Sequence, residues 1–274
     1  MISNRFKDDG LFESSEPAES VHALADVWRR VVADRRTGEI SDQPGLAVRW
    51  AESDFIFWNC LTSIDRVTER DQLEDLFSRS AAYLRAQSKP GLLWSFTGMV
   101  APEHRPLIPE IADRAGLKCT NMGFGMAGDI LPVAPPFRQD IEFVRIRTED
   151  HLRMYADLNA MAYGFPLEAV RSALRGSDLF TSEAFAYLAL VDGEPVSAAA
   201  AIANGANLFL ILVATAPADQ RRGYGEAVVR KALSEGGRAT GLTRTTLHAT
   251  LAGAPVYERI GYRKVSDIGF YGLK

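Results

Sequence analysis

Apolar residues in the first half of the chain recur at the three- and four-residue spacing of helix faces. Over residues 18–36 this spacing predicts a helix, and Gly38 follows as a stop. A second periodic stretch, over 69–87, predicts another helix. Continuous apolar runs predict strands around these helices, at 46–50, 55–61 and 92–100, and a further helix is expected to end at Gly116.

The second half alternates helical and strand patterns, with turn residues between them. Residues 149–162 and 167–175 are expected to be helical, and the sequence Tyr-Gly-Phe-Pro at 163–166 interrupts them. Asp192-Gly193 and Asn204-Gly205 predict hairpin turns, so three strands follow one another in antiparallel order. The expected strands are 141–147, 184–191, 195–202, 207–215, 243–250 and those from 262 onward, and the later helices are 224–235 and 253–260.

Three prolines within five residues separate the two halves. They fall in the segment DILPVAPPF, residues 129–137, and exclude a helix interior or a central strand there. The first residues of the chain are polar and charged, with little to bury. The sequence therefore predicts a flexible tail (1–17), a first domain (18–130), a proline-rich linker (131–140) and a second domain (141–274).

Composition narrows the class of protein. The 274 residues suffice for two domains of ordinary size, and the 47% hydrophobic share supplies their cores. The formal net charge of -4 argues against a nucleic-acid binder. Two cysteines without CxxC spacing and four scattered histidines predict no metal centre. Without a signal peptide or a long apolar stretch, we expect a cytoplasmic protein that does not span a membrane.

The sequence QRRGYGEAVV, residues 220–229, places Gly223 and Gly225 just ahead of an expected helix. Glycine has a helix propensity about 1 kcal/mol less favourable than that of alanine, so two glycines at a helix start call for a physical explanation. A helix N-terminus favours anions, absent Cβ atoms let a phosphate approach, and Arg221 and Arg222 add charge. The turn therefore predicts a pyrophosphate site, although a GxG before a helix also fits a plain turn. No Gly-Lys-Ser/Thr follows and antiparallel hairpins precede, which excludes a Walker loop and a dinucleotide fingerprint.

Residues 220–225 fit the Gln/Arg-x-x-Gly-x-Gly/Ala signature of the GNAT acetyltransferases, the GCN5-related N-acetyltransferase superfamily. The stretch LFLILVATAPADQRRGYG (208–225) resembles the fourth strand and pyrophosphate loop of that family, and APVYERIGYRKV (254–265) resembles its closing helix and strand. The order of elements over 141–274 is also similar. The resemblance implies an α/β (α+β) GNAT fold, with a mixed, mostly antiparallel sheet flanked by helices.

The same resemblance implies acetyl-CoA as co-substrate and no metal. In this family the fourth strand separates from the fifth at a bulge and pairs with the pantetheine arm, and the next loop holds the pyrophosphate. Thr250 stands where the family often has a pantetheine-binding Asn, and its hydroxyl bonds less completely. Tyr224 has the alternative of facing solvent at the helix start. Carried onto this sequence, the cofactor-binding positions are Val213, Thr215, Arg221, Arg222, Gly223, Tyr224, Gly225, Glu226 and Thr250.

Tyr257 matches the usual general acid of the family, by its spacing to Gly261-Tyr262. An amine attacks the thioester directly, and a phenol can protonate the departing thiolate. The alternative is a tyrosine that only packs on the last helix. His248 and Glu168 are candidate bases, but each is also explained as structural or solvent-facing, and proton transfer to water needs neither. Tyr163, Phe165 and Pro166 are expected to shape the mouth for the acceptor.

The first half echoes the second in its order of paired strands, helix, strand and helix, and RAGLK at 114–118 resembles ERIGYR at 258–263. It has no QxxGxG, so we expect a degenerate GNAT-like repeat that binds no CoA. Where glycines would stand after its strand, the segment 99–109 carries Pro102, Pro106 and Pro109. Three tryptophans are expected in its core: Trp50, Trp58 and Trp94.

These patterns predict an N-acyltransferase that moves an acetyl group from acetyl-CoA to a small-molecule or peptide amine in a ternary complex. The protein is expected to be a monomer or a homodimer. Thr250 and the undetermined base leave a non-catalytic, acyl-CoA-binding regulatory or scaffolding protein as the alternative. A partner-binding module, in which the two glycines only turn the chain, is a third possibility.

Overall fold

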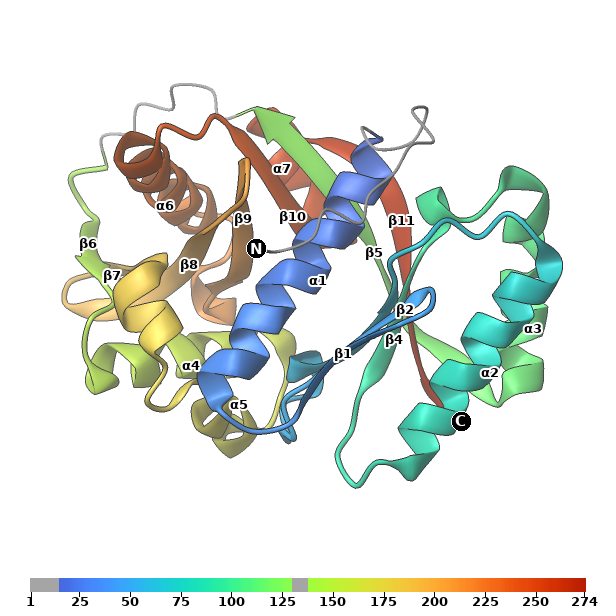
Figure 1. Cartoon of the computed structure of the whole chain (residues 1–274). Coiled ribbons are helices and arrows are strands. Elements are labelled where there is room, and N and C mark those ends of the chain that lie inside the picture. The colour runs from blue at the N-terminus through green and yellow to red at the C-terminus, as the bar shows by residue number, and fades with distance from the viewer. Residues whose placement is uncertain (1–14, 130–137) are drawn as a thin grey trace, which may run out of the picture.

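One sheet runs through the described part of the chain, residues 15–129 and 138–274 of the computed structural model (Figure 1). Its eleven strands in these residues lie in the order β1-β2-β3-β4-β11-β5-β10-β9-β8-β7-β6. The strands are β1 (Glu39–Gln43), β2 (Leu46–Trp50), β3 (Asn59–Ser63), β4 (Leu92–Phe96), β5 (Leu117–Asp129), β6 (Glu142–Arg145), β7 (Phe185–Val191), β8 (Glu194–Asn204), β9 (Asn207–Thr215), β10 (Arg244–Thr250) and β11 (Arg263–Leu273). The α-helices are α1 (Glu16–Arg35), α2 (Arg70–Ala86), α3 (Ile108–Ala115), α4 (Glu149–Tyr163), α5 (Leu167–Leu174), α6 (Tyr224–Thr240) and α7 (Ala254–Arg259).

Two strand pairs in this sheet are parallel, β3 with β4 and β9 with β10, and the other neighbours are antiparallel. Each parallel pair is joined by a helix, α2 in the first half and α6 in the second, because parallel neighbours need a crossover connection. The two halves thus repeat one arrangement. The expected fold class, a mixed and mostly antiparallel sheet flanked by helices, is confirmed.

The middle of the sheet is built from both halves in alternation. β11, near the end of the chain, lies between β4 and β5 and pairs with both; β5 in turn pairs with β10. Tyr271 of β11, for example, stands opposite Leu93 of β4 on one side and Cys119 of β5 on the other. The sheet is therefore continuous across the boundary expected from the sequence.

β5 is absent from the strands expected above, and its glycines explain why. A Cβ at Gly123 would lie 2.6 Å from the Ala249 carbonyl oxygen of β10, and one at Gly125 would lie 2.6 Å from Oγ of Ser20 in α1. Glycine is therefore required where β5 passes beside β10 and beneath α1. The same glycines remove the alternation of side chains by which a strand is recognised in a sequence.

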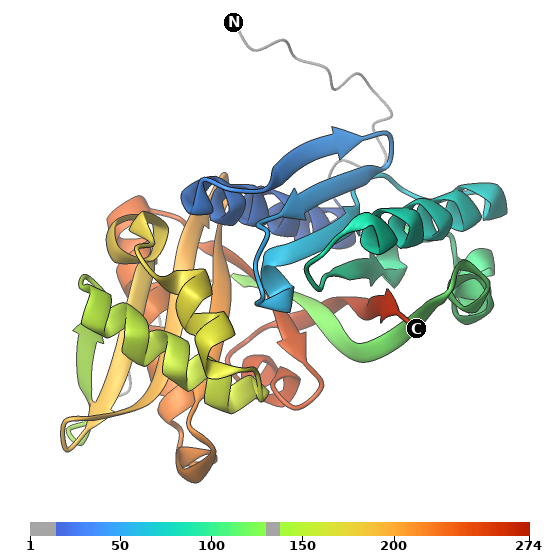
Figure 2. The same ribbon diagram turned by 90° about the horizontal axis from the view of Figure 1, so that it is seen from below.

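α1 lies across one face of the sheet, over strands of both halves (Figures 1 and 2). Its Trp28 ring has its centroid 5.3 Å from that of Trp94 in β4 and 6.0 Å from that of Phe209 in β9. The helix begins inside the tail expected from the sequence, with Ser15 as its N-cap. The rest of that tail, residues 1–14, and most of the expected linker, residues 131–137, lie outside the described residues.

Ion pairs fasten the start of α1 to the last strands. Arg244 of β10 pairs with Glu16 at 2.8 Å and with Glu19 at 2.6 Å, and Arg263 of β11 also pairs with Glu16. The hydrogen bond from Arg263 is the main reason that the pKa of Glu16 lies below its usual range. The first described helix is thus held by the final strands of the chain.

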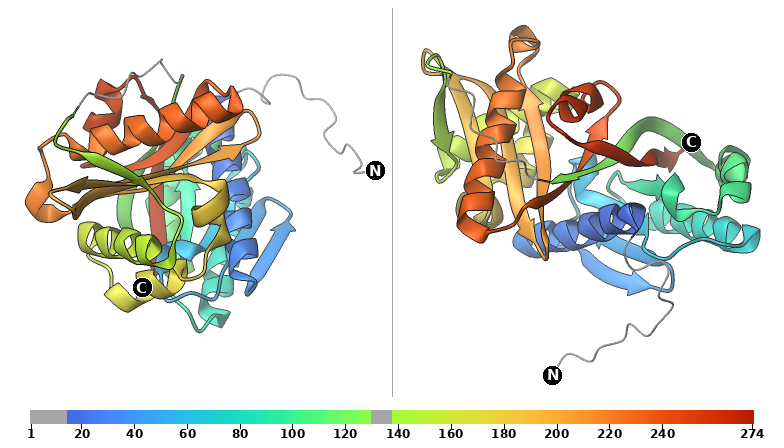
Figure 3. Two further views of the ribbon diagram at one scale, coloured as in Figure 1. Left: turned by 90° about the vertical axis from the view of Figure 1, so that its left-hand side faces the viewer. Right: turned by 90° about the horizontal axis from the view of Figure 1, so that it is seen from above.

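Helices cover both faces of the sheet. α4 and α5 share the face of α1, whereas α6 and α7 cover the opposite face in the second half and α2 and α3 cover it in the first (Figure 3). Trp50, Trp58 and Trp94 are buried, as expected. The apolar run at 55–61 is not one strand, however: Ile56–Trp58 forms a 3-10 turn, and β3 begins only at Asn59.

Candidate functional site

β9 and β10 separate at their carboxyl ends. Their parallel pairing ends with Leu210 opposite Leu247, after which β9 continues against β8 alone and β10 against β5 alone. The separation coincides with a bulge in β9, where Leu212 has a φ of 50° and the register against β8 shifts. The resemblance implied a separation and a bulge at this strand pair, and the structure contains both.

The backbone groups of Val213 and Thr215 face the gap between the two strands. Just beyond them, the Ala216 N–H donates to the Val196 carbonyl on the β8 side at 2.9 Å. Successive residues of a strand turn their N–H and C=O groups to opposite neighbours. Val213 and Thr215 alternate with Ala216 and therefore point to the side that β10 has left. There the Tyr163 hydroxyl donates to the Val213 carbonyl at 2.6 Å.

The turn between β9 and α6 alternates the sign of φ. This angle is -63° at Gln220, 62° at Arg221 and 82° at Gly223, while Arg222 between them is not in the positive range. Such alternation directs successive N–H groups to one concave side, a nest that binds anions. α6 has Gly223 as its N-cap, and no side chain caps it. Its first N–H groups are therefore left for a bound anion.

Gly223 and Gly225 are each required in this turn, for different physical reasons. Gly223 adopts a left-handed φ of 82°, which other residues rarely do. A Cβ at Gly225 would instead lie 2.9 Å from Thr215 Oγ1, so α6 can approach the end of β9 only without a side chain there. Tyr224 between them is 6% exposed and packs in the core beneath α6. The alternative that it faces solvent is wrong.

Arg138 also lies against this turn, although the family signature does not include it. Its Nη1 donates to the Arg222 carbonyl at 2.8 Å, and its guanidinium carbon lies 5.0 Å from the centroid of the Tyr224 ring. Asp140 accepts two further bonds from the guanidinium, of 2.8 and 2.6 Å. The sequence contains no sign of this contact, because Arg138 and Arg222 lie 84 residues apart in the chain.

The balance of charge around the turn is positive. Arg221 and Arg222 are exposed; Arg222 pairs with Asp219 at 3.2 Å, and Arg221 has no ion pair with any described residue. Glu226 in the first turn of α6 is compensated by Arg230, at 2.8 Å, and Arg259, at 3.8 Å. Its side chain is thus engaged, so only its N–H is free to contribute to an anion site.

Tyr257, the candidate acid, is 8% exposed on α7. Burial raises the pKa of its phenol well above the ordinary value, and the nearby Tyr163 and Tyr262 phenols raise it further. Tyr262 is engaged with Thr245 at 2.8 Å, whereas the Tyr257 hydroxyl has no hydrogen-bond partner among the described residues. The phenol therefore stays protonated at neutral pH, with its proton unshared.

The two candidate bases lie in unfavourable surroundings for that role. The His248 ring packs among Trp94, Phe96 and Phe209, and its Nε2 lies 3.1 Å from Ser20 Oγ. Parts of this ring keep some access to solvent, but Nδ1 is buried without a partner, and burial lowers the pKa of His248 to about 3.

Glu168, the second candidate base, and Thr250, the last predicted cofactor-binding residue, both make local hydrogen bonds or ion pairs. Glu168 is exposed on α5 and pairs with Arg171 at 3.2 Å. Thr250 ends β10, and its hydroxyl oxygen accepts the Gly253 N–H at 3.1 Å, which fixes the turn into α7. The Thr250 hydroxyl proton remains available to a ligand, so the replacement of Asn leaves a donor at this position.

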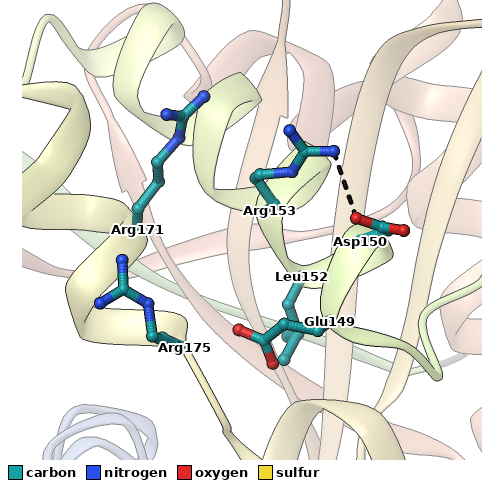
Figure 4. Close-up of a pocket in the computed structure, with 6 residues that line it drawn as sticks. All are labelled: Glu149, Asp150, Leu152, Arg153, Arg171 and Arg175. Atoms are coloured by element: carbon teal, nitrogen blue, oxygen red, sulfur yellow. Dashed lines mark hydrogen bonds and ion pairs between the residues drawn. The ribbon is translucent and has the colours of Figure 1, made fainter.

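Two cavities of the described chain lie elsewhere. One, of about 220 Å³, lies between α4 and α5 (Figure 4). Its charges are compensated locally, since Arg171 pairs with Asp157 at 2.6 Å and Arg153 with Asp150 at 3.2 Å. The other, of about 270 Å³, lies where β3 leads into α2. Neither is lined by any of the predicted cofactor-binding residues.

The first half has no gap at the end of its parallel strand pair, where β9 and β10 separate in the second half. After β3 the chain continues beside the extension of β4, where Val67 exchanges backbone hydrogen bonds of 2.9 Å with Met99 and Ala101 in a parallel bridge. At the N-terminus of α2, the Gln72 side-chain oxygen accepts the N–H groups of Thr68 and Glu69 at 2.9 and 3.1 Å. In the first half, the Val67 backbone thus fills the position equivalent to the gap, and the Gln72 side chain bonds to the N–H groups at the helix start.

Metal-binding clusters and membrane-spanning helices are both missing from the described part of the chain. Residues 15–129 and 138–274 contain no cluster of three or more histidine, cysteine or acidic side chains placed to hold a metal ion. None of the helices in these ranges combines the length and apolar character needed to cross a membrane.

A family model described as the Acetyltransferase (GNAT) domain matches residues 164–270. This part of the chain, which contains the turn at 220–226 and Tyr257, is therefore a GNAT acetyltransferase domain. No curated protein sequence matches the chain.

Solved structures share the fold over nearly the whole chain. A GCN5-related N-acetyltransferase from Kribbella flavida superposes with a TM-score of 0.68 at 15% identity, over 93% of this chain and 95% of that one. A GCN5-related N-acetyltransferase from Sphaerobacter thermophilus superposes with a TM-score of 0.60 at 12% identity, over 94% of this chain and 91% of that one. At these identities the likeness shows the fold, and it extends that fold to the first half.

The low pKa of His248 gives a prediction for acid stability. The folded chain keeps this ring neutral down to about pH 3, whereas the unfolded chain protonates it near pH 6.5. The unfolded state therefore binds more protons between these values, and the free energy of unfolding should fall by up to about 1.4 kcal/mol per pH unit as the pH drops through them. His248→Gln should lose this contribution. Urea unfolding of both proteins from pH 6.5 to 4 measures it, and equal slopes would contradict a buried neutral ring.

The close approach at Gly225 gives a second prediction. Gly225→Ala should destabilise the fold by about 1–3 kcal/mol through overpacking against Thr215, although alanine is the better helix former. Thr215→Ala in the same chain removes the obstructing atom, so the double variant should be more stable than the sum of the two losses predicts. Denaturant unfolding of all four proteins measures the coupling. Strict additivity would mean that another contact fixes Gly225.

Proposed function

We propose that the chain is an N-acyltransferase that moves an acetyl group from acetyl-CoA to a small-molecule or peptide amine, through the GNAT acetyltransferase domain at residues 164–270. One observation carries this proposal: the uncapped N-terminus of α6, with its alternating φ angles, lies directly after the strand that has separated from β10. An anion site and an open strand edge thus adjoin each other. A nucleotide pyrophosphate with an extended amide arm has the shape and chemistry to use both.

In this proposal the N–H groups of residues 221–226 bind the pyrophosphate. The positive charge left by Arg221, which has no ion pair with a described residue, supports that assignment. The pantetheine amides pair with the backbone of Val213 and Thr215, whose groups face the gap. The free hydroxyl proton of Thr250 supplies a donor on the opposite strand.

The proposed reaction is direct attack of a neutral amine on the thioester carbonyl. A C–N bond forms, the C–S bond breaks, the departing thiolate takes the proton of Tyr257, and the phenolate then regains a proton from water. Because the pKa of this phenol is raised, Tyr257 stays protonated until the C–S bond breaks and the thiolate accepts the proton. The amine loses its own proton to water, since His248 is packed among aromatic rings and Glu168 is held in an exposed ion pair.

We also propose that the first half binds no CoA and that it contributes to the acceptor side. The Val67 backbone occupies the position equivalent to the gap, and the acidic Glu69 precedes α2 where an anion would have to bind. Aromatic rings of both halves meet beside the expected acceptor mouth: the Phe57 centroid lies 5.0 Å from that of Phe165 and 6.2 Å from that of Tyr163.

Calorimetric titration of acetyl-CoA tests the anion site. Wild type should bind, and Gly223→Glu should weaken binding tenfold or more, roughly 1.4 kcal/mol, because a carboxylate replaces the space and charge that a phosphate needs. Gly241→Glu is the matched control. Gly241 caps the other end of the same helix with nearly the same angles, φ 74° and ψ 2° against 82° and 2° at Gly223. It should bind like wild type.

The outcomes separate the three interpretations of the sequence. Absence of binding by wild type would overturn the proposed function and leave the glycines as a plain turn. Equal losses in both glutamate variants would point to a general effect of the substitution rather than to an anion site. Tight binding without turnover of any amine would favour the non-catalytic, acyl-CoA-binding alternative, for which the occupied lone pair of Thr250 is the supporting observation.

Tyr257→Phe tests the acid. The rate constant kcat should fall about 100-fold, because general acid catalysis is lost, while affinity for acetyl-CoA stays within about twofold. Tyr262→Phe is the control, since the ring centroids of the two tyrosines lie 5.7 Å apart in one core and Tyr262 bonds only to Thr245. It should lose stability with little change in kcat. An unchanged rate in Tyr257→Phe would remove this residue from the mechanism.

A further inference from the structure

We propose that Tyr163 is a positioning residue of the transfer site, which fixes the bulged backbone beside the gap through its hydrogen bond to the Val213 carbonyl. The structural part of this inference concerns the chain alone, and only its consequence for the rate rests on the proposed function. Tyr163 stands on α4, far from the pyrophosphate turn in sequence and just outside the residues that the family model matches.

The direction of the Tyr163 side chain is well determined. α4 ends at this residue because Gly164 adopts a left-handed φ of 70°, and the Phe165 N–H then bonds back to the Ala160 carbonyl at 3.0 Å. The Tyr163 ring packs beside Phe57 of the first half, with 6.2 Å between the centroids. The helix end and the neighbouring ring together aim the hydroxyl at β9.

The Val213 carbonyl needs a partner from outside the sheet. β10 has already left β9, and Leu212 just before it has an unfavourable positive φ of 50°. A carbonyl without a partner beside apolar side chains would leave the bulge free to relax toward another backbone path. The phenol supplies the missing donor at 2.6 Å, at the short end of the range for O–H···O bonds. It therefore holds one orientation of the peptide after Val213.

Tyr155 offers a comparison within the same helix. Its hydroxyl donates to the Ile211 carbonyl of β9, but at 3.3 Å and next to Leu210, which still pairs with β10. Tyr155 is fully buried, whereas Tyr163 keeps part of its side chain open to solvent. Two phenols of α4 thus bond to alternate carbonyls of β9, and only the second reaches the open part of the strand.

This placement links Tyr163 to the reacting end of the site. The N–H and C=O groups of Val213 border the gap along which the thioester arm is proposed to lie. The Tyr163 phenol also adds to the raised pKa of Tyr257, so the two hydroxyls share one electrostatic environment. Small displacements of the groups that position reactants lower the reaction rate steeply, because the reacting atoms must be aligned closely. Loosening of the bulge should therefore affect turnover more than binding.

The test compares Tyr163→Phe with Tyr155→Phe, which each lose one hydroxyl from α4. Amide hydrogen exchange on the ligand-free protein should show the segment 211–216 exchanging about tenfold faster in Tyr163→Phe and within about twofold of wild type in Tyr155→Phe. In the acyl-transfer assay, Tyr163→Phe should lower kcat about tenfold with a smaller change in the KM for acetyl-CoA. Tyr155→Phe should keep kcat near wild type even where it lowers the melting temperature more.

Each outcome decides the inference. Unchanged exchange at 211–216 in Tyr163→Phe would overturn it, whatever the rate. Loss of kcat in both variants in proportion to lost stability would show a merely structural role and also overturn it. If wild type transfers no acetyl group, the proposed function fails, but the exchange comparison still determines whether Tyr163 fixes the bulge.

Discussion

The candidate site depends on the loss of pairing between β9 and β10 after Leu210. A β-sheet is held by continuous ladders of hydrogen bonds, and a break in its interior leaves backbone groups that must find other partners. Here a side chain supplies one partner: the Tyr163 hydroxyl donates to the Val213 carbonyl, which faces the gap. This bond gives the backbone after the bulge a partner in place of the lost ladder.

The two halves show what happens with and without such a break. Both contain a parallel pair with a helical crossover, so both begin from the same arrangement. In the first half Val67 rejoins the extension of β4, and Gln72 occupies the N–H groups before α2. In the second half the turn carries glycines where the first has acidic and threonine residues, and α6 starts without a cap. The two halves thus share one arrangement and differ at the end of the parallel pair, which Val67 bridges in the first half and which stays open in the second.

The sequence predicted the second half better than the first, for physical reasons. The hairpins at 192–193 and 204–205, the helix at the glycine turn and the strand before it are local patterns, and the structure contains all of them. β5 could not be predicted, because its glycines are required by close contacts with Ala249 and Ser20, which are distant in sequence. The place of β11 between β4 and β5 is likewise a property of the assembled sheet.

The predictable part of the site was equally local. Gly223, Gly225 and Tyr257 stand in short motifs with fixed spacing, and the reason for Gly225, contact with Thr215, is visible only in the packed structure. Arg138 was missed because nothing in its own sequence neighbourhood marks it, and its contact with the turn joins residues 84 positions apart. The candidate base His248 had a suitable ordinary pKa, but its aromatic surroundings, formed by β4 and β9, lower that value.

The interleaved strands let the first half support the gap of the second half, although its own strand pair is closed. β10, which forms one wall of the gap, takes its full-length partner from β5 of the first half, and β5 is in turn backed by β11. α1 lies over this region and is tied to both final strands by Arg244 and Arg263. A wall that has lost its partner on one side must be supported from the other, or the strand would be free to close the gap. In this chain the strand that supports β10 is β5 of the first half, which β11 backs in turn.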